Sequence, residues 1–237
     1  GITMRNLLIL VLAAAFVVSC SNNDPVSPAE PTVKIPGKGS TFEIAGYQLD
    51  AANAKIAGTD FTAVQTVANT GQSFGDKTGV WSTISTDKAS GEVLDTNYMC
   101  LDDKKDLLLW TPELGADGSS RWLRLPVSSG LVSVDSVVST EEFNGIPIEL
   151  AVSVRAERSG DETIVVAGSS FATKKITIRY TIRISALGQV IDTATFNETQ
   201  WFAPSLGMII QRSTGAYTLA DQASPGSYFK LTKYTLK

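Results

Sequence analysis

The sequence predicts an all-β protein whose strands are antiparallel. From residue 41 to the end, apolar and polar residues alternate almost everywhere, and short polar turns interrupt this alternation. Beyond the N-terminal segment, no stretch keeps a helical period over about three turns. The pattern indicates about 11 to 12 strands joined by hairpin-length links. These strands form an antiparallel meander, either as a strongly curved sheet or half-barrel or as a two-sheet sandwich.

The clearest strand covers residues 174–185, which read KKITIRYTIRIS. Its period of two directs alternate side chains to opposite faces of a sheet. One face is apolar and is expected to be buried; it carries Ile176, Ile178, Tyr180, Ile182 and Ile184. The other face is basic and is expected to face water; it carries Lys175, Arg179 and Arg183.

The segments around this strand extend it into a meander over residues 146–202. Residues 148–157 and 162–167 precede it, with a turn predicted at 158–161, and residues 190–202 follow it. We therefore expect this region to hold four antiparallel strands. Shorter strands are expected in the front half and the tail, at residues 61–68, 79–85, 92–101, 106–111, 121–127, 207–212 and 228–236.

The N-terminal segment is typical of a secreted precursor. Residues 4–6 form a short positive region, and residues 7–18 are an unbroken apolar run, too short to cross about 30 Å of hydrocarbon as a helix. The run ends in Val17-Val18-Ser19-Cys20, which resembles the lipobox of bacterial lipoproteins. The resemblance implies that residues 1–19 are removed as a signal peptide. Cys20 would then carry a diacylglycerol and a fatty acyl chain such as palmitate. The alternative is an ordinary signal peptide with an incidental cysteine.

Residues 20–40 are predicted to be a lipid-anchored, proline-rich tether. Four of the nine prolines lie between residues 25 and 36, and such a segment favours extended polyproline conformations of about 3.1 Å per residue. Ser21 stands where an aspartate would favour retention in the inner membrane, so we expect the outer membrane. Both its periplasmic face and the cell surface remain open. The remaining residues, 41–237, form the single all-β domain.

The composition excludes several kinds of chemistry. The 237 residues include no histidine, which excludes Ser-His-Asp and Cys-His nucleophilic sites and imidazole metal ligands. With 20 Lys and Arg against 24 Asp and Glu and no basic block, the chain lacks the signature of a nucleic-acid-binding protein. No cofactor motif, metal-ligand set or catalytic group is identified in the sequence.

Two features with polar or reactive side chains have plain structural interpretations. Asp102, Asp103 and Asp106 surround two lysines, but their spacing matches no calcium loop, so a solvated hairpin tip is expected. Cys100 has no partner for an intrachain disulfide once Cys20 is acylated. It is expected to be a small buried hydrophobic residue on a strand rather than a reactive thiol.

Two groups of residues are candidate contacts for a ligand. The basic stripe of Lys175, Arg179 and Arg183 could hold phosphate or carboxylate groups, and the alternative is a solubilising outer face. A curled sheet also needs a filler for its concave side, and no amphipathic helix is available to supply one. The filler is then a second sheet or an apolar ligand. The candidate contacts of such a ligand are Trp110, Trp122, Tyr180, Trp201 and Phe202.

Two motifs resemble a group of bacterial envelope lipoproteins whose function is uncharacterised. Residues 165–173, VVAGSSFAT, are similar to a valine-x-alanine-glycine-x-phenylalanine turn in that group. Residues 201–209, WFAPSLGMI, are similar to its tryptophan-aromatic-alanine-x-x-x-glycine-aliphatic element, and the likeness covers residues 58–215. The resemblance implies a curved antiparallel sheet similar to that of periplasmic lipoprotein carriers. It implies no catalytic residue.

These observations predict an outer-membrane lipoprotein that acts as a non-catalytic interaction or structural module of the cell envelope. Its partner would be an envelope protein, a glycan or a lipid, in addition to the membrane that holds Cys20. The first alternative is a carrier or sensor of an apolar or amphiphilic ligand held on the concave sheet. The second alternative is a hydrolase, for which no arrangement of carboxylates is recognisable.

Overall fold

The computed structural model describes residues 32–111, 122–128, 133–143 and 145–237. The chain divides into two compact units, residues 1–30 and 31–237, and the described residues belong to the second. The predicted signal peptide, Cys20 and most of the predicted tether therefore lie outside the described residues.

The described residues form fourteen strands and no helix. Twelve strands make one antiparallel sheet in the order β6-β5-β4-β3-β2-β1-β14-β11-β10-β9-β8-β7, and β12 pairs with β13 in a small hairpin. The strands are β1 (Thr41–Leu49), β2 (Phe61–Phe74), β3 (Lys77–Asp87), β4 (Val93–Leu101), β5 (Leu107–Trp110), β6 (Trp122–Leu125), β7 (Ser133–Phe143), β8 (Ile146–Val166), β9 (Ser169–Ala186), β10 (Gln189–Ala203), β11 (Met208–Thr214), β12 (Tyr217–Leu219), β13 (Gln222–Ser224) and β14 (Gly226–Thr235).

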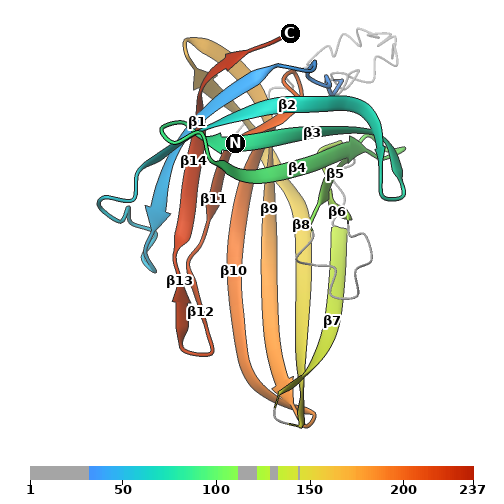
Figure 1. Ribbon diagram of the computed structural model, residues 1–237, viewed down its shortest axis with the longest axis vertical. Helices are drawn as coiled ribbons and strands as arrows, with labels where there is room; N and C mark the ends of the chain where they lie inside the picture. The colour runs from blue at the N-terminus through green and yellow to red at the C-terminus, as the bar shows by residue number, and fades with distance from the viewer. Residues whose placement is uncertain (1–31, 112–121, 129–132, 144) are drawn as a thin grey trace, which may run out of the picture. The chain divides into compact units, whose positions relative to one another are not determined.

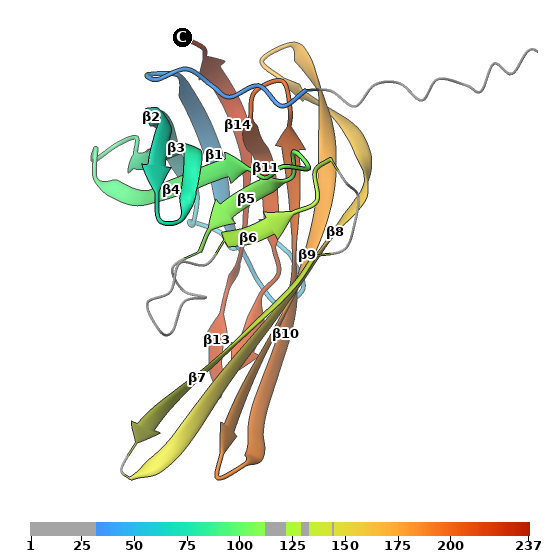
Figure 2. The same ribbon diagram turned by 90° about the vertical axis from the view of Figure 1, so that its right-hand side faces the viewer.

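This large sheet curls until its two edges approach each other. The strands of the front half, β2 to β4, run across the long strands β9 and β10 of the back half (Figure 1). The edge strand β6 lies against β7 and β8 at the other edge, as the turned view shows (Figure 2). The prediction of an antiparallel all-β fold is confirmed, and of its two forms the strongly curved sheet is the one observed, not the two-sheet sandwich.

The prediction of a turn at residues 158–161 is wrong. β8 runs through this segment as one 21-residue strand, with Arg158 opposite Ile176 and Gly160 opposite Lys175, so Ser159 is an extra residue in a β-bulge. A turn here would make the two halves of β8 pair with each other. Both halves instead pair with β9, whose 18 residues are long enough to hold them. Residues 146–202 therefore contain three strands and not four.

The interior of the curled sheet is filled by side chains from both halves. Phe42, Trp81 and Leu107 come from the front half, Ile176 and Phe202 come from the back half, and each is at most 1% exposed. Together they belong to one continuous hydrophobic cluster, apart from a smaller cluster on the outer face of β3, β4 and β5. The curl buries this face because the edges of the sheet come together around it.

The packed chain begins ahead of residue 41. The amide of Lys34 donates to the carbonyl of Pro204 at 2.8 Å, Val33 packs against the core, and Ser40 is buried. Gly207 makes this contact possible: its φ is +63°, and a Cβ there would lie 2.1 Å from the Lys34 carbonyl oxygen. The final part of the predicted tether is thus attached to the β10–β11 turn.

The ends of β8, β9 and β10 extend beyond the curled part of the sheet (Figures 1 and 2). We call this extension the arm and define it as residues 146–154, 180–186 and 189–196. The β7–β8 turn and the β9–β10 turn both lie at its tip, at the end of the sheet opposite to the β10–β11 turn.

Candidate functional site

A cavity of about 190 Å³ opens on the concave face of the curled sheet. Its wall comes from β1 to β5 in the front half and from β10, β11 and β14 in the back half. Small side chains at Ala63, Thr83 and Ser85 leave this part of the concave face unfilled. Most of the remaining wall is apolar and consists of Ile44, Phe61, Leu94, Met99, Leu109, Met208, Ile209 and Phe229.

One side of this concave cavity is polar and contains two buried atoms without a hydrogen-bond partner. Gln200 on β10 is 2% exposed; its Nε2 donates to Glu198, and its Oε1 has no partner. Arg212 on β11 lies directly across from Gln200, and its buried Nε also lacks a hydrogen-bond partner. Leaving such a group unpaired costs about 1–3 kcal/mol. Gln200 and Arg212 both line the cavity, so the Arg212 Nε–H could donate to an oxygen of a ligand there, and Gln200 Oε1 could accept from a hydroxyl or N–H group.

Glu198 holds these two polar side chains in place. The residue is 7% exposed, and its carboxylate accepts hydrogen bonds from the Gln200 amide and, at 2.8 Å, from the Thr214 hydroxyl. Arg212 Nε lies 4.0 Å from Glu198 Oε2, and the guanidinium lies 5.0 Å from the centre of the Phe229 ring. The Arg212 side chain is nevertheless 41% exposed. It is therefore accessible to an anionic or carbonyl oxygen in the cavity.

A β-bulge on β11 places an apolar residue and a cation on the same wall. Ile209 pairs with Phe202 and Gln211 pairs with Trp201, so Ile210 is an extra residue in β11. Strict alternation would send Ile209 and Arg212 to opposite faces, but the bulge reverses the alternation between them. Both therefore line the concave cavity.

The five predicted ligand contacts do not form one site. Tyr180 and Phe202 lie on the concave face, where Phe202 is completely buried in the core. Trp201 lies on the outer face: its Nε1 donates to Glu162 at 2.7 Å, and Lys175 Nζ lies 5.3 Å from its ring centre. Trp201 and Phe202, neighbours on β10, thus lie on opposite faces of the sheet.

The two remaining tryptophans form a separate cluster on the outer face of the front half. Trp110 and Trp122 meet edge to face at 5.5 Å, and both contact Phe74 at the end of β2. Phe74 in turn stacks on Tyr98, and Trp122 Nε1 donates to Asp76 at 2.9 Å. The extended β2–β3 hairpin therefore covers these aromatic rings. This packing accounts for them without a ligand.

The predicted basic stripe does share the outer face of β9. Lys175 is paired with Glu162 at 2.6 Å. Arg179 lies directly opposite Arg155 of β8 and next to Asn197 of β10. Within the described residues, neither Arg179 nor Arg183 takes part in an ion pair, and both lie on the face opposite to the concave cavity.

The expectation of a solvated hairpin tip is wrong for Asp106, which is completely buried and pairs with Arg124 at 2.6 Å. Its burial is possible because the Arg124 guanidinium compensates its charge, while Asp102 caps the hairpin by accepting from the amides of Lys104 and Asp106. Cys100 is buried, as expected. Burial raises the pKa of its thiol to about 11, so the thiol is protonated at neutral pH.

Sequence reasoning missed the polar side of the concave cavity. Glu198 and Gln200 share a strand face with Phe196 and Phe202, and polar residues on an otherwise apolar strand face were the available signal. Arg212 carried no such signal, because the Ile210 bulge that turns it inward is visible only in the strand register.

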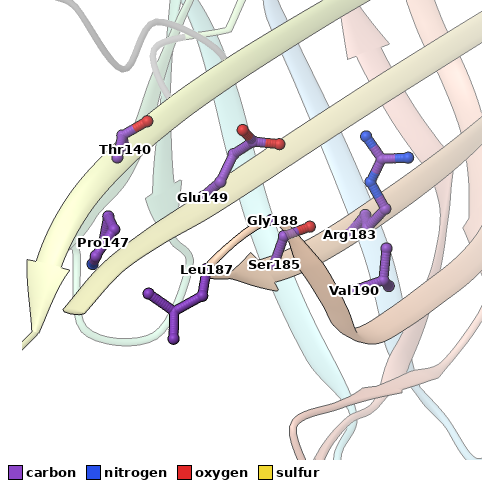
Figure 3. Close-up of a pocket in the computed structure, with 8 residues that line it drawn as sticks. All are labelled: Thr140, Pro147, Glu149, Arg183, Ser185, Leu187, Gly188 and Val190. Atoms are coloured by element: carbon purple, nitrogen blue, oxygen red, sulfur yellow. The ribbon is translucent and has the colours of Figure 1, made fainter.

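A second cavity, of about 430 Å³, lies at the tip of the arm on the outer face. Figure 3 shows its lining, in which Arg183 and Glu149 stand near Leu187 and Val190. No cluster of Asp, Glu or Cys among the described residues is arranged to hold a metal ion. Nor do those residues include a helix with the length and hydrophobicity needed to span a bilayer.

Comparisons with known proteins show what this fold is similar to. No model of a known protein family matches the sequence, and no curated protein is significantly similar to it. A solved structure of a candidate lipoprotein from Parabacteroides distasonis is 14% identical, with a TM-score of 0.51 over 86% of this chain and 99% of that one. A candidate exported protein with a YmcC-like fold from Bacteroides fragilis is 13% identical, with a TM-score of 0.42 over 86% and 99% of the two chains. The first likeness shows a shared fold, in agreement with the curved sheet that the sequence resemblance implied.

Proposed function

We propose that this protein is an outer-membrane lipoprotein that binds the apolar part of an amphiphilic molecule in its concave cavity. The observation that carries the proposal is the unpaired Arg212 Nε–H beside the buried Gln200 amide, in a cavity whose wall is mostly apolar but also includes Gln65, Asp95 and Asn97. A purely structural core would gain by pairing or replacing these groups. A ligand with an acyl chain and an anionic or carbonyl oxygen would contact the apolar part of the wall and accept a hydrogen bond from Arg212, whereas Gln200 Oε1 would need a donor such as a hydroxyl group.

The size of the cavity favours a single chain over a bulky ligand. Its volume of about 190 Å³ is below the range of roughly 300–1,000 Å³ that is common for sites of drug-sized ligands. The proposed ligand therefore places one acyl chain against Ile44, Met99 and Ile209, and its oxygens reach Arg212. The proposed activity is ligand binding without catalysis. We favour a carrier or sensor role over a purely structural one.

The location in the envelope rests on the N-terminal sequence. The Val17-to-Cys20 motif supports lipid attachment, and the hydrogen bond from Lys34 to Pro204 in the β10–β11 turn supports a domain held at that end. The shared fold with a candidate lipoprotein is consistent with this location.

Decanoate, a single-chain carboxylate, is the probe that tests the proposal. Residues 21–237 retain every described contact, because the packed chain begins at Val33. We expect native mass spectrometry and calorimetry to show one bound decanoate. Arg212→Met should weaken binding about tenfold or more, because a charge-assisted hydrogen bond contributes about 1.5–3 kcal/mol. Ala63→Leu should reduce binding by filling the cavity.

Arg183→Met is the matched control, since it removes an arginine that lies outside the concave cavity. Thermal unfolding of each variant verifies that it is folded. If decanoate does not bind the wild-type protein, or binds the Arg212→Met and Ala63→Leu variants as tightly as the wild type, the proposal is wrong. The protein would then be an interaction module without a concave ligand.

A further inference from the structure

The arm and the adjacent strand β7 carry a concentration of exposed aliphatic side chains. Of the eleven exposed large hydrophobic residues among the described ones, six lie here. Leu187 is the most exposed of the six at 73%, and it occupies the β9–β10 turn. The other five are Val138, Ile146, Leu150, Val190 and Ile191. Val138, Leu187 and Val190 lie on the outer face and Leu150 on the concave face, so both faces of the tip carry exposed aliphatic groups, and such a concentration marks an interaction surface.

The concave face of the arm connects this apolar tip with the concave cavity. Successive rows across β8, β9 and β10 leave the cavity wall at Gln200 and pass through strand positions that alternate onto the same face. These rows are Ala156–Ile178–Glu198, Val154–Tyr180–Phe196, Val152–Ile182–Ala194 and Leu150–Ile184–Asp192. Most of these side chains are apolar, and we call this surface the apolar lane. From Ile178 to Leu187 it spans roughly 30 Å at about 3.3 Å per residue.

Burial decreases steadily along the apolar lane. Ile178 is completely buried, Ile182 and Ile184 are half-buried, and Leu150 near the tip is 38% exposed. Tyr180 stacks on Phe196 at 4.8 Å, and Tyr217 of β12 stacks on the other side of Phe196 at 4.4 Å. The lane is therefore open toward the tip and covered toward the cavity.

The turn at the tip holds a leucine in an unfavourable backbone conformation. Leu187 has a φ of +51° and is followed by Gly188 at +75°. Asn, Asp or Gly normally occupies the first of these positions, since a left-handed conformation costs most other residues roughly 1–2 kcal/mol. The chain thus presents an exposed leucine where a polar residue would fold more easily, which points to a function for the apolar side chain.

Charges around the tip have both signs. Within the described residues Arg183 takes part in no ion pair, and in Figure 3 its guanidinium points away from Leu187 toward the body of the arm. Glu149 lies on the neighbouring strand, and Glu142 is exposed on β7. The mixture gives the tip no strong attraction to either charge sign, so its aliphatic side chains dominate any contact.

We infer that the tip of the arm inserts its aliphatic side chains into the interface of a lipid bilayer, and that the apolar lane then guides an acyl chain to the concave cavity. This inference rests on the proposed function. A bilayer is favoured as the occupant because exposed aliphatic groups gather at two neighbouring hairpin ends, and because the lane leads from them to a cavity suited to an acyl chain. Arg183, about four residues above Leu187, lies at the height of a phosphate layer.

Vesicle flotation tests the docking step. Residues 21–237 are mixed with phosphatidylcholine vesicles at low and high salt, and the bound fraction is measured. We expect binding that is insensitive to salt and that weakens at least tenfold for each of Leu187→Asp and Ile191→Asp, because each substitution removes a buried aliphatic group from the bilayer. Val165→Asp is the matched control: Val165 is 66% exposed but lies at the opposite end of β8.

Binding of decanoate in solution separates this inference from the proposed function. We expect the Leu187→Asp and Ile191→Asp variants to bind decanoate like the wild type and to be slow only in taking up a long-chain fatty acid from vesicles. Ile184→Asp, in the lane, should retain vesicle binding and lose this uptake. If the wild-type protein does not float with vesicles, or the tip variants float equally well, the inference is overturned even when decanoate binds.

Discussion

The two halves of β9 carry the same alternating pattern but have very different environments. Ile176 and Ile178 are completely buried, whereas Ile182 and Ile184, on the same face of the same strand, are half-exposed. The difference arises because the front half of the sheet curls over the first pair and stops short of the second. A period of two thus determines the face on which a side chain lies, and the cover above that face determines its burial.

This comparison separates side chains that stabilise the fold from side chains that remain available for contacts. In the curled part, apolar groups from both halves fill the interior. In the arm, the same residue types remain partly exposed and lead to the tip. Mutations in the two regions should therefore differ in kind, with stability affected in one and binding in the other.

The largest expected effect is in the curled part. Phe202→Ala should lower the free energy of unfolding by about 3–5 kcal/mol, because Phe202 is completely buried and its removal leaves a cavity. Ile184→Ala in the arm should lower it by only about 1 kcal/mol, since Ile184 is half-exposed. Urea unfolding followed by circular dichroism measures both. Equal losses would contradict the distinction between the two regions.

A smaller effect of opposite sign is expected at the tip. Leu187→Asn should raise the free energy of unfolding by about 1 kcal/mol, because asparagine tolerates the left-handed conformation better than leucine. The same variant should bind vesicles less well. A shift in the thermal midpoint measures the first effect, and a lower midpoint would show that Leu187 stabilises the fold instead.

The smallest effect concerns pH at the outer face of the curled part. Hydrogen bonds from Lys175 and Trp201 lower the pKa of Glu162 below its ordinary value of 4.5. The carboxylate therefore contributes stability above the unfolded-state pKa, and this contribution is lost as the pH falls through the lower folded-state pKa. Because Glu162 is 44% exposed, solvent screening limits the contribution to about 0.5 kcal/mol.

Glu162→Gln should remove this part of the acid sensitivity. Urea unfolding at pH values from 6 down to about 3 compares the variant with the wild type. The two curves of stability against pH should converge at the acid end. Parallel curves would mean that Glu162 has the same pKa in the folded and unfolded protein.

Much of the fold was predictable because it depends on local alternation. The apolar and basic faces of residues 174–185 and the opposite orientations of Trp201 and Phe202 follow from the period of two alone. The bulge at Ser159 was not predictable, since Ser159-Gly160 is an ordinary turn sequence. Only the length of the partner strand β9 makes β8 continue through it.

The candidate site was less predictable than the fold. The sequence indicated a concave face that needs a filler, but the tryptophans proposed to contact a ligand lie on the outer face. The cavity is instead lined by small residues such as Ala63 in the front half and by the polar pair Gln200 and Arg212 in the back half. Ala63 comes close to this pair only because the front half of the sheet crosses the back half.

The sequence by itself determined the all-β class, the two faces of the long strands and the exclusion of histidine chemistry, because each depends on residue type or on neighbours along one strand. Only the tertiary structure decided for a single curled sheet, the inward turn of Arg212 at the Ile210 bulge and the exposure of the arm. These features depend on strand register and on the curl of the whole sheet, which bring together residues that no local pattern connects.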